Sequence, residues 1–84
     1  MKRPVYAIHD EFTGFGSPFV DVNDASAQRN FAFAINNNGD TMTFSPKDYA
    51  LYKLGEFDHE SGAFEPLPCP LLVVRGDVLK ATDA

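Results

Sequence analysis

Hydrophobic and polar positions in the first quarter of the chain predict one strand followed by an irregular segment. Residues 4–9, Pro-Val-Tyr-Ala-Ile-His, are rich in β-forming side chains and begin with a proline, which suits the start of a strand. Residues 11–19 combine three phenylalanines with two glycines and a proline, and indicate a structured loop with aromatic anchors. Phe19-Val20 is compatible with a short extended segment.

A single helix is predicted from Asn23 onward. Asn23 and Asp24 carry side-chain oxygens that can accept hydrogen bonds from the unpaired amides of a first helical turn. The apolar positions recur at spacings of four, three and one and form one stripe: Ala27, Phe31, Ala34 and Ile35. Arg29 and Phe33 project away from that stripe. The helix is expected to end within residues 36–39, Asn-Asn-Asn-Gly, because Asn and Gly tolerate a left-handed backbone.

The second half of the chain predicts a hairpin. Residues 45–48, Ser-Pro-Lys-Asp, are a turn signal, since proline presets the backbone angle of its second position. Residues 49–57 form the strongest strand pattern, and Gly55 inside it indicates a bulge. Residues 58–62 connect to a return strand that starts at Ala63-Phe64, with Gly62 able to adopt a positive φ.

Prolines at alternate positions mark an edge of the predicted sheet. Pro66, Pro68 and Pro70 remove three amide donors from one side of an extended segment, which protects that side from unwanted strand addition. Residues 71–74 are a last short strand. The order strand, helix, strand, strand predicts a small α+β domain over residues 1–80, with one helix packed on an antiparallel or mixed sheet of three to four strands. Residues 81–84 are expected to be a disordered tail.

Length and cysteine content narrow the class of protein. Eighty-four residues suffice for one modest core, and a lone Cys69 cannot form an internal disulfide, which fits a reducing compartment. The longest apolar run, residues 71–74, is too short to cross a bilayer, and no basic-then-apolar leader opens the chain. We therefore expect a soluble intracellular protein without a membrane role.

The charge is negative overall but unevenly placed. Seven Lys and Arg face twelve Asp and Glu, a net charge of -5, which argues against a wholly cationic nucleic-acid-binding surface. Four of the acids lie between Lys53 and Arg75, where there is no Lys or Arg: Glu56, Asp58, Glu60 and Glu65. Without those four the chain has seven Lys and Arg and eight Asp and Glu, so a local basic face is compatible with the composition.

Catalytic and metal-binding patterns are weak. His9-Asp10-Glu11 and Asp58-His59-Glu60 have ligand types that suit zinc, but sequence neighbours on a strand point apart and rarely close one tetrahedral site. No nucleophile elbow is present, and Cys69 has no basic neighbour that would lower its pKa. Gly14-Phe15-Gly16 lacks the remaining residues of a phosphate-binding loop and favours a tight turn. We expect no enzyme, no cofactor and no metal, although convergence of His9 and His59 would reopen the question.

The aromatic content suggests a binding surface. Eight Phe and three Tyr exceed what one helix on a small sheet needs, and single-stranded nucleic acid is bound by exposed rings with scattered cations. The rings that qualify are Tyr6, Phe33 and Tyr52, and the phosphate-binding cations are Arg29, Lys47, Lys53 and Arg75. Burial in the core or in a dimer interface is the more ordinary explanation of such rings.

The middle of the chain resembles the small nonstructural protein of gokushovirus-type microviruses, phages with circular single-stranded DNA. The matching features are a capped helix with Arg29 and Phe31 two apart, a Pro-x-Asp-Tyr-x-Leu-Tyr-x-Leu-Gly-x-Phe-Asp run over residues 46–58, and Gly62 followed by Phe64. The resemblance implies a non-enzymatic DNA-binding protein of the host cytoplasm that acts between duplex replication and single-strand synthesis or packaging.

The leading hypothesis is therefore a phage protein that binds single-stranded DNA through six residues: Arg29, Phe33, Lys47, Tyr52, Lys53 and Arg75. The alternative is an acidic protein–protein adaptor, in which residues 56–65 meet a basic replication or capsid protein of the phage or its host. A homodimer is expected in either case, because a domain this small carries many rings and an exposed sheet edge.

Overall fold

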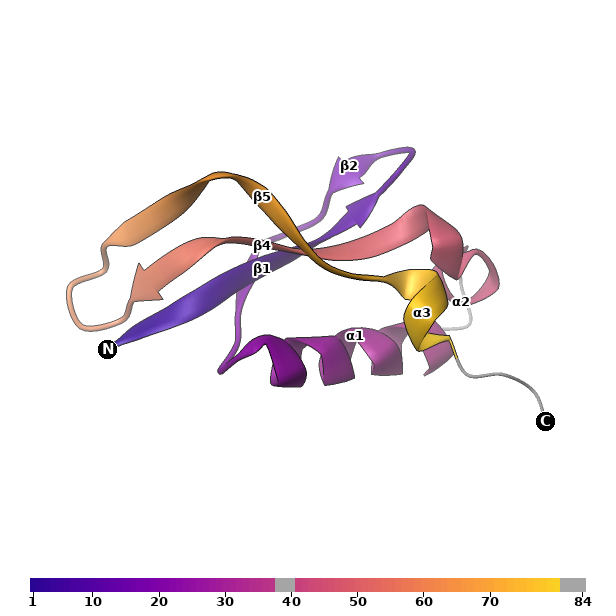
Figure 1. The fold of residues 1–84 in the computed structure, drawn as a ribbon, viewed down its shortest axis with the longest axis horizontal. Helices are drawn as coiled ribbons and strands as arrows, with labels where there is room; N and C mark the ends of the chain where they lie inside the picture. The colour runs from indigo at the N-terminus through magenta and orange to yellow at the C-terminus, as the bar shows by residue number, and fades with distance from the viewer. Residues whose placement is uncertain (38–40, 81–84) are drawn as a thin grey trace.

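The computed structural model describes residues 1–37 and 41–80 as a curled antiparallel sheet with helices on one side (Figure 1). In chain order the elements are β1 (Lys2–Asp10), β2 (Gly14–Phe15), β3 (Phe19–Val20), α1 (Asp24–Asn37), α2 (Thr41–Phe44), the 3₁₀ helix η1 (Pro46–Asp48), β4 (Tyr49–Asp58), β5 (Phe64–Arg75) and α3 (Gly76–Leu79). The α+β class is confirmed, and one long helix packs on the sheet as predicted.

The sheet is larger than predicted and entirely antiparallel. Its strand order is β2-β1-β4-β5, and β3 pairs with β1 on the same side as β2, which makes five strands. The strand β2 comes from the segment that was expected to be a loop, where Phe15 lies opposite His9. The strand β3 is the short extended segment suggested at Phe19-Val20, and Val20 lies opposite Val5. Strands of two residues carry no periodic signal of their own, so only pairing with β1 defines them.

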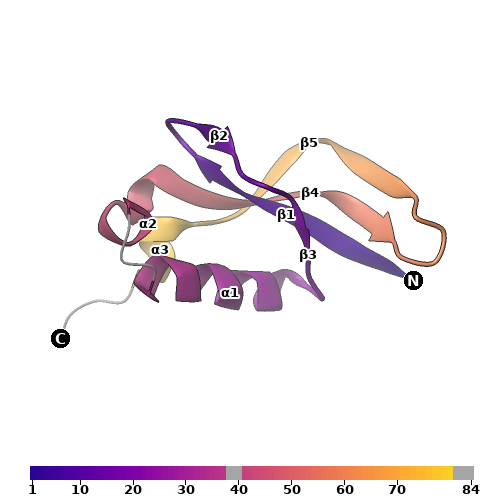
Figure 2. The ribbon, with the colours of Figure 1, turned by 180° about the vertical axis from the view of Figure 1, so that it is seen from behind.

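The helix α1 runs beneath one face of the sheet, as seen from both sides in Figures 1 and 2. Asn23 caps it as predicted: its side-chain oxygen accepts a hydrogen bond from the Ser26 amide at 2.8 Å. The stripe residues Ala27, Phe31 and Ile35 are buried against the sheet. The end of α1 is described only to Asn37, and the predicted Asn38 and Gly39 lie outside the described residues, as does the predicted tail of residues 81–84.

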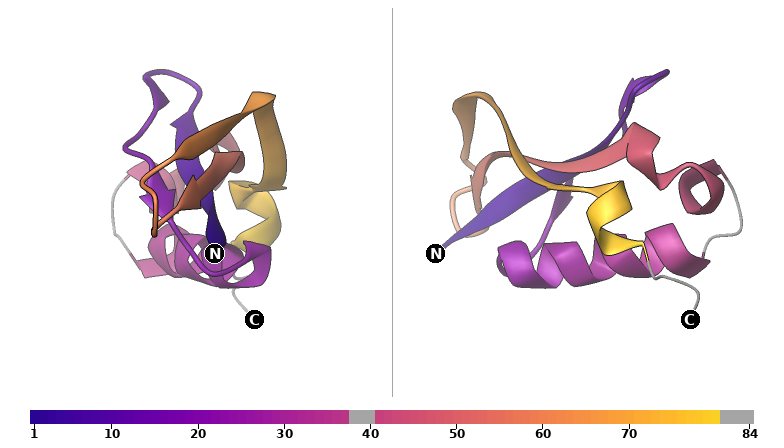
Figure 3. Two further views of the ribbon diagram at one scale, coloured as in Figure 1. Left: turned by 90° about the vertical axis from the view of Figure 1, so that its left-hand side faces the viewer. Right: turned by 45° about the vertical axis from the view of Figure 1, so that its right-hand side comes forward.

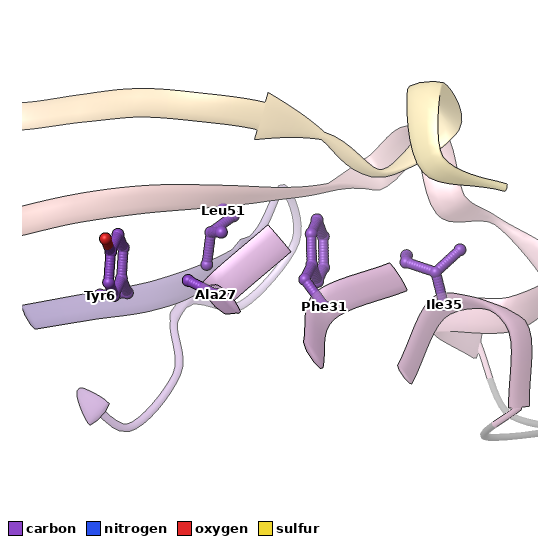
Figure 4. Close-up of a cluster of buried hydrophobic side chains, with 5 residues drawn as sticks. All are labelled: Tyr6, Ala27, Phe31, Ile35 and Leu51. Carbon is purple, nitrogen blue, oxygen red and sulfur yellow. The ribbon is translucent and has the colours of Figure 1, made fainter. Parts of the chain in front are cut away.

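The core lies between α1 and the sheet. Five side chains are almost completely buried there and lie together in Figure 4: Tyr6, Ala27, Phe31, Ile35 and Leu51. Tyr6 was one of three rings considered for base stacking, with burial in the core as the more ordinary explanation, and the structure shows it buried. Its hydroxyl donates a hydrogen bond to the carboxylate of Asp24, the first residue of α1. The hydroxyl therefore has a partner, and the ring is buried in the core.

Gly55 marks a bulge in β4, as predicted, at a point where β5 approaches closely. The pairing of β4 with β1 shifts so that Leu54 is the extra residue, and the pairing with β5 shifts between Lys53 and Gly55. A Cβ atom on Gly55 would lie 2.3 Å from the Glu65 carbonyl oxygen, so only glycine allows β5 to approach this closely. Gly62 ends the hairpin connection with a φ of 78°, as expected.

The proline segment belongs to one continuous strand, which corrects the separate last strand predicted at residues 71–74. β5 runs from Phe64 to Arg75 and pairs only with β4 in the described sheet, so the prolines lie on an edge strand as expected. Four residues, 67–70, lie between the pairs Gly55–Pro66 and Lys53–Leu71, so β5 arches away from β4 and curls the sheet (Figure 3). None of the described helices is long and apolar enough to cross a bilayer.

Candidate nucleic-acid interface

The sheet has one face that α1 does not cover, and the strand register identifies its residues. Opposed residues of antiparallel neighbours point to the same face. One row across four strands contains Phe15, His9, Ala50 and Arg75, and the next row on that face contains Ala7, Tyr52 and Leu72. The row between them, Ile8, Leu51 and Val74, points to the core, where Leu51 is fully buried. The first two rows therefore form the face opposite α1.

Three rings meet on this face and form what we call the ring cluster: His9, Phe15 and Tyr52. The ring centroids of His9 and Phe15 lie 4.6 Å apart, those of Phe15 and Tyr52 5.4 Å, and those of His9 and Tyr52 5.8 Å. All three pairs are edge-on, the arrangement that the aromatic quadrupole favours. Phe15 remains 47% exposed, so the cluster is both packed and accessible.

The β1–β2 turn holds Phe15 in the cluster. The Asp10 carboxylate accepts a hydrogen bond from the Phe12 amide at 2.9 Å, and this bond is the main cause that lowers the pKa of Asp10. Gly14 then takes a φ of 94°, which reverses the chain, and the Gly16 amide donates to the Ile8 carbonyl at 2.8 Å. The turn is thus fixed on both sides of Phe15 by backbone amides, one bonded to a carboxylate and the other to a carbonyl.

A pocket of about 250 Å³ adjoins the ring cluster, and we call it the polar pocket. His9 and Tyr52 form one wall together with Tyr49, Ala50 and Leu72; Lys47 and Arg75 contribute cations, and Glu11 and Asp48 contribute carboxylates. The amide of Glu11 donates to the carbonyl of Asp48 at 3.0 Å and so joins the end of β1 to η1. Two cations and two carboxylates leave the pocket without net charge when His9 is neutral.

The six residues expected at a DNA-binding surface separate into two groups. Lys47, Tyr52 and Arg75 line the polar pocket together. Arg29 and Phe33 are exposed on α1, in the layer on the other side of the sheet, with Phe33 69% exposed. Lys53 lies opposite Tyr6 in the ladder of β1 and β4, so it points to the face that carries α1.

His9 and Phe15 join the surface although sequence reasoning did not include them. His9 was considered as the end of a strand and as a metal ligand, and Phe15 as an aromatic anchor of a loop and part of a turn. The signal that identifies both is their register, Phe15 opposite His9 and His9 opposite Ala50, which becomes visible once residues 14–15 are known to form a strand.

The acidic residues of the hairpin form a separate region, the acidic tip, consisting of Glu56, Asp58, Glu60 and Glu65. It lies with the N-terminus at one end of the long axis of the molecule, beyond the start of α1 (Figure 1). Tyr52 and Asp58 are six positions apart along β4, roughly 20 Å of extended chain. The rings and cations of the polar pocket are therefore well separated from the acidic tip.

Cations at the start of the chain offset part of the acidic tip. The N-terminal amine lies 2.6 Å from Glu60 and 3.7 Å from Asp58, and Lys2 lies 2.6 Å from Glu65. The hydrogen bond to Glu65 raises the pKa of Lys2, and the hydrogen bond from the Glu60 amide lowers the pKa of Asp58. These pairs are solvent-exposed, so each stabilises the fold only slightly.

An apolar groove of about 530 Å³ continues along the same sheet face toward the acidic tip. Its lining residues are apolar or weakly polar: Val5, Pro18, Phe19, Val20, Leu54, Phe57, Phe64, Pro66, Leu67, Pro68, Cys69 and Pro70. Val5 shares its side of β1 with His9, because the two positions are four residues apart on a strand of period two. Phe64 is partly exposed at the rim of the groove.

Metal ligands do not converge in the described part of the chain. His9 lies in the ring cluster, His59 lies in the hairpin connection, and residues 1–37 and 41–80 contain no group of three His, Cys, Asp or Glu that could hold a metal ion. His9 and Asp10 end β1, and His59 follows the last residue of β4.

The fold and this surface define a small α+β protein with aromatic rings and cations gathered on the open face of an antiparallel sheet. Among protein families, the model of the phage ORF5 protein family matches residues 3–79, so the chain belongs to that family and is a phage protein. No curated protein and no solved structure matches the chain.

Proposed function

We propose that this phage protein binds single-stranded DNA without catalysis, in the cytoplasm of the infected host, and serves replication or packaging of a genome of the gokushovirus type. One observation carries the proposal: the ring cluster lies on the open sheet face directly beside Lys47 and Arg75. Rings stack on bases whose faces are exposed, and cations hold the adjacent phosphates. A duplex hides those faces, which is why the proposal specifies single strands.

The magnitudes favour modest affinity. Stacking of one base on an aromatic side chain contributes about 1–3 kcal/mol, and two phosphate contacts give a slope of about -1.4 for log K against log salt concentration. With a net charge of -5, long-range attraction to DNA is absent, so binding depends on contacts at the site. We therefore expect dissociation constants in the micromolar range at low salt.

Anisotropy titration of a labelled oligothymidine tests the stacking contact. Tyr52→Leu keeps apolar volume but removes the ring, and is expected to weaken binding about tenfold, within the range for one stacked base. Phe33→Leu is the matched control, since Phe33 is also an exposed aromatic residue but lies on α1. Equal affinities of the two variants would exclude the ring cluster as the binding surface, and failure of the wild-type protein to bind at tens of micromolar would exclude the function.

The cations are tested by the salt dependence of the same titration. Arg75→Gln is expected to reduce the steepness of the salt dependence by about 0.7, the contribution of one phosphate contact to a single strand. Arg29→Gln is the matched control, because Arg29 lies on α1, away from the polar pocket. A slope that Arg29→Gln reduces and Arg75→Gln leaves unchanged would place the DNA on the helical layer instead.

A second function is favoured by the acidic tip and the apolar groove beside it. An adaptor for a basic replication or capsid protein would use this end of the molecule, where four carboxylates outnumber the N-terminal amine and Lys2. Neutralising Glu56, Asp58 and Glu60 together separates the two functions. DNA affinity is expected to hold or rise, whereas an adaptor would lose its partner in a pull-down from infected cells.

We also propose that the protein is a homodimer. Exposed apolar side chains on β5, Phe64, Leu71 and Leu72, support a second copy covering this edge of the sheet. Light scattering over a concentration series tests it, and a monomeric mass at the highest concentration would exclude the dimer.

A further inference from the structure

The polar pocket contains two carboxylates that phosphate binding does not require. Glu11 and Asp48 line it beside Lys47 and Arg75. A site that only holds phosphates is weakened by carboxylates, because like charges repel. Neither carboxylate has a hydrogen bond or an ion pair within residues 1–37 and 41–80, so both can accept hydrogen bonds from a ligand.

Donor and acceptor chemistry identifies the ligand that needs such a pocket. Guanine presents two adjacent N–H donors, N1–H and the 2-amino group, which one carboxylate can accept side by side, and two acceptors, O6 and N7, which Arg or Lys can reach. Thymine has a single N–H between two carbonyls and cannot use a carboxylate in this way. A pocket of about 250 Å³ lies below the roughly 300–1,000 Å³ of sites for drug-sized ligands, and so suits one base.

We propose that the polar pocket reads guanine in single-stranded DNA: Asp48 or Glu11 accepts from its N1–H and 2-amino groups, Lys47 and Arg75 donate to O6, N7 or the neighbouring phosphate, and Tyr52 packs against the base. The inference rests on the proposed function, since it specifies what the same site prefers. On this proposal, the carboxylates and cations of the polar pocket together select the base. The ring cluster contributes stacking, which is available to every base.

Anisotropy titration with a set of matched oligonucleotides tests the inference. The set consists of an oligothymidine and of the same strand with isolated guanines, hypoxanthines or cytosines, spaced by thymines so that no quadruplex forms. The guanine strand is expected to bind at least about fivefold more tightly than the thymine strand, the lower end of what a bidentate base contact provides. Hypoxanthine lacks the 2-amino group and is expected to lose most of this preference.

Variants separate base reading from simple repulsion. Asp48→Asn and Glu11→Gln leave one oxygen acceptor in place of two, so their double variant is expected to lose the guanine preference while affinity for the thymine strand holds or rises. If the carboxylates only repel phosphate, the double variant strengthens binding of both strands equally, which would overturn the inference. Glu60→Gln, a carboxylate-to-amide change at the acidic tip, is the control and is expected to keep the preference.

The outcomes distinguish failure of the inference from failure of the proposed function. Binding of all strands with equal affinity would overturn the guanine reading and leave single-strand binding intact. Binding of none would overturn both. The same series made of ribonucleotides presents the same base edge, so tighter binding of the ribonucleotide strands by the wild-type protein would overturn the assignment to DNA.

Discussion

Gly55 provides the sharpest test of the curled sheet. It lies opposite Val5 on one side and Pro66 on the other, in the middle of three antiparallel strands. A Cβ atom there would lie 2.3 Å from the Glu65 carbonyl oxygen and 2.9 Å from both Pro66 Cα and Phe64 Cζ. Two of these three atoms belong to the backbone of β5, so Gly55→Ala can fold only if the strand moves away.

The cost follows from two opposing contributions. Overpacking costs about 1–3 kcal/mol, and a backbone obstacle places Gly55→Ala at the upper end of that range. Alanine in a strand recovers about 0.5–1 kcal/mol of the backbone entropy that glycine loses on folding. The expected net loss in the free energy of unfolding is about 2 kcal/mol, which lowers the melting temperature of a domain of this size by roughly 8–16 °C.

Urea unfolding followed by far-ultraviolet circular dichroism measures this loss, with Gly16→Ala as the control. Gly16 has a φ outside the left-handed region, and an added Cβ would meet only the Ile8 carbonyl, at an ordinary 3.5 Å. Gly16→Ala is therefore expected to be neutral or to stabilise by about 0.4–1 kcal/mol. A Gly55→Ala variant as stable as Gly16→Ala would refute the close approach of β5 to Gly55.

Two further predictions concern the helical layer. Asn23→Ala removes the cap of α1 and is expected to lower the free energy of unfolding by about 0.5–2 kcal/mol, while Asn23→Asp keeps the acceptor and most of the stability; equal melting curves for all three proteins would contradict the cap. Burial and the hydrogen bond to Asp24 raise the pKa of Tyr6 far above its usual value. Above pH 10 the unfolded chain therefore loses the hydroxyl proton, whereas the folded state keeps it. The free energy of unfolding is expected to fall as the pH rises through this range. Tyr6→Phe is expected to flatten this alkaline decline, and an unchanged decline would show that the Tyr6 hydroxyl is solvated.

Local signals in the sequence predicted the parts of the fold that depend on neighbours along the chain. The cap at Asn23, the apolar stripe through Phe31, the bulge at Gly55 and the turn at Gly62 are all present. Each depends on a side chain or backbone preference that acts within a few residues, so the sequence alone is sufficient to predict it.

Features that depend on pairing at a distance could not be predicted in this way. Phe15 is part of a strand only because it pairs with β1. The strand β5 is continuous because it pairs with β4 on both sides of residues 67–70. The ring cluster combines residues from β1, β2 and β4, so no spacing along the sequence predicts it. The choice between stacking and burial for Tyr6 stayed open for the same reason, since its hydroxyl partner Asp24 comes from another element.

Titration of the isotope-labelled protein with an oligothymidine, followed by amide chemical shifts, tests the central claim most directly, because it locates the bound strand without any substitution. If the strand binds the open sheet face, shifts are expected at the amides of His9, Phe15, Tyr52 and Arg75, with little change at Phe33 on α1 or in residues 58–62 of the hairpin connection. Shifts confined to α1 or to that connection, or no shifts at all, would contradict the claim that the open sheet face binds single-stranded DNA.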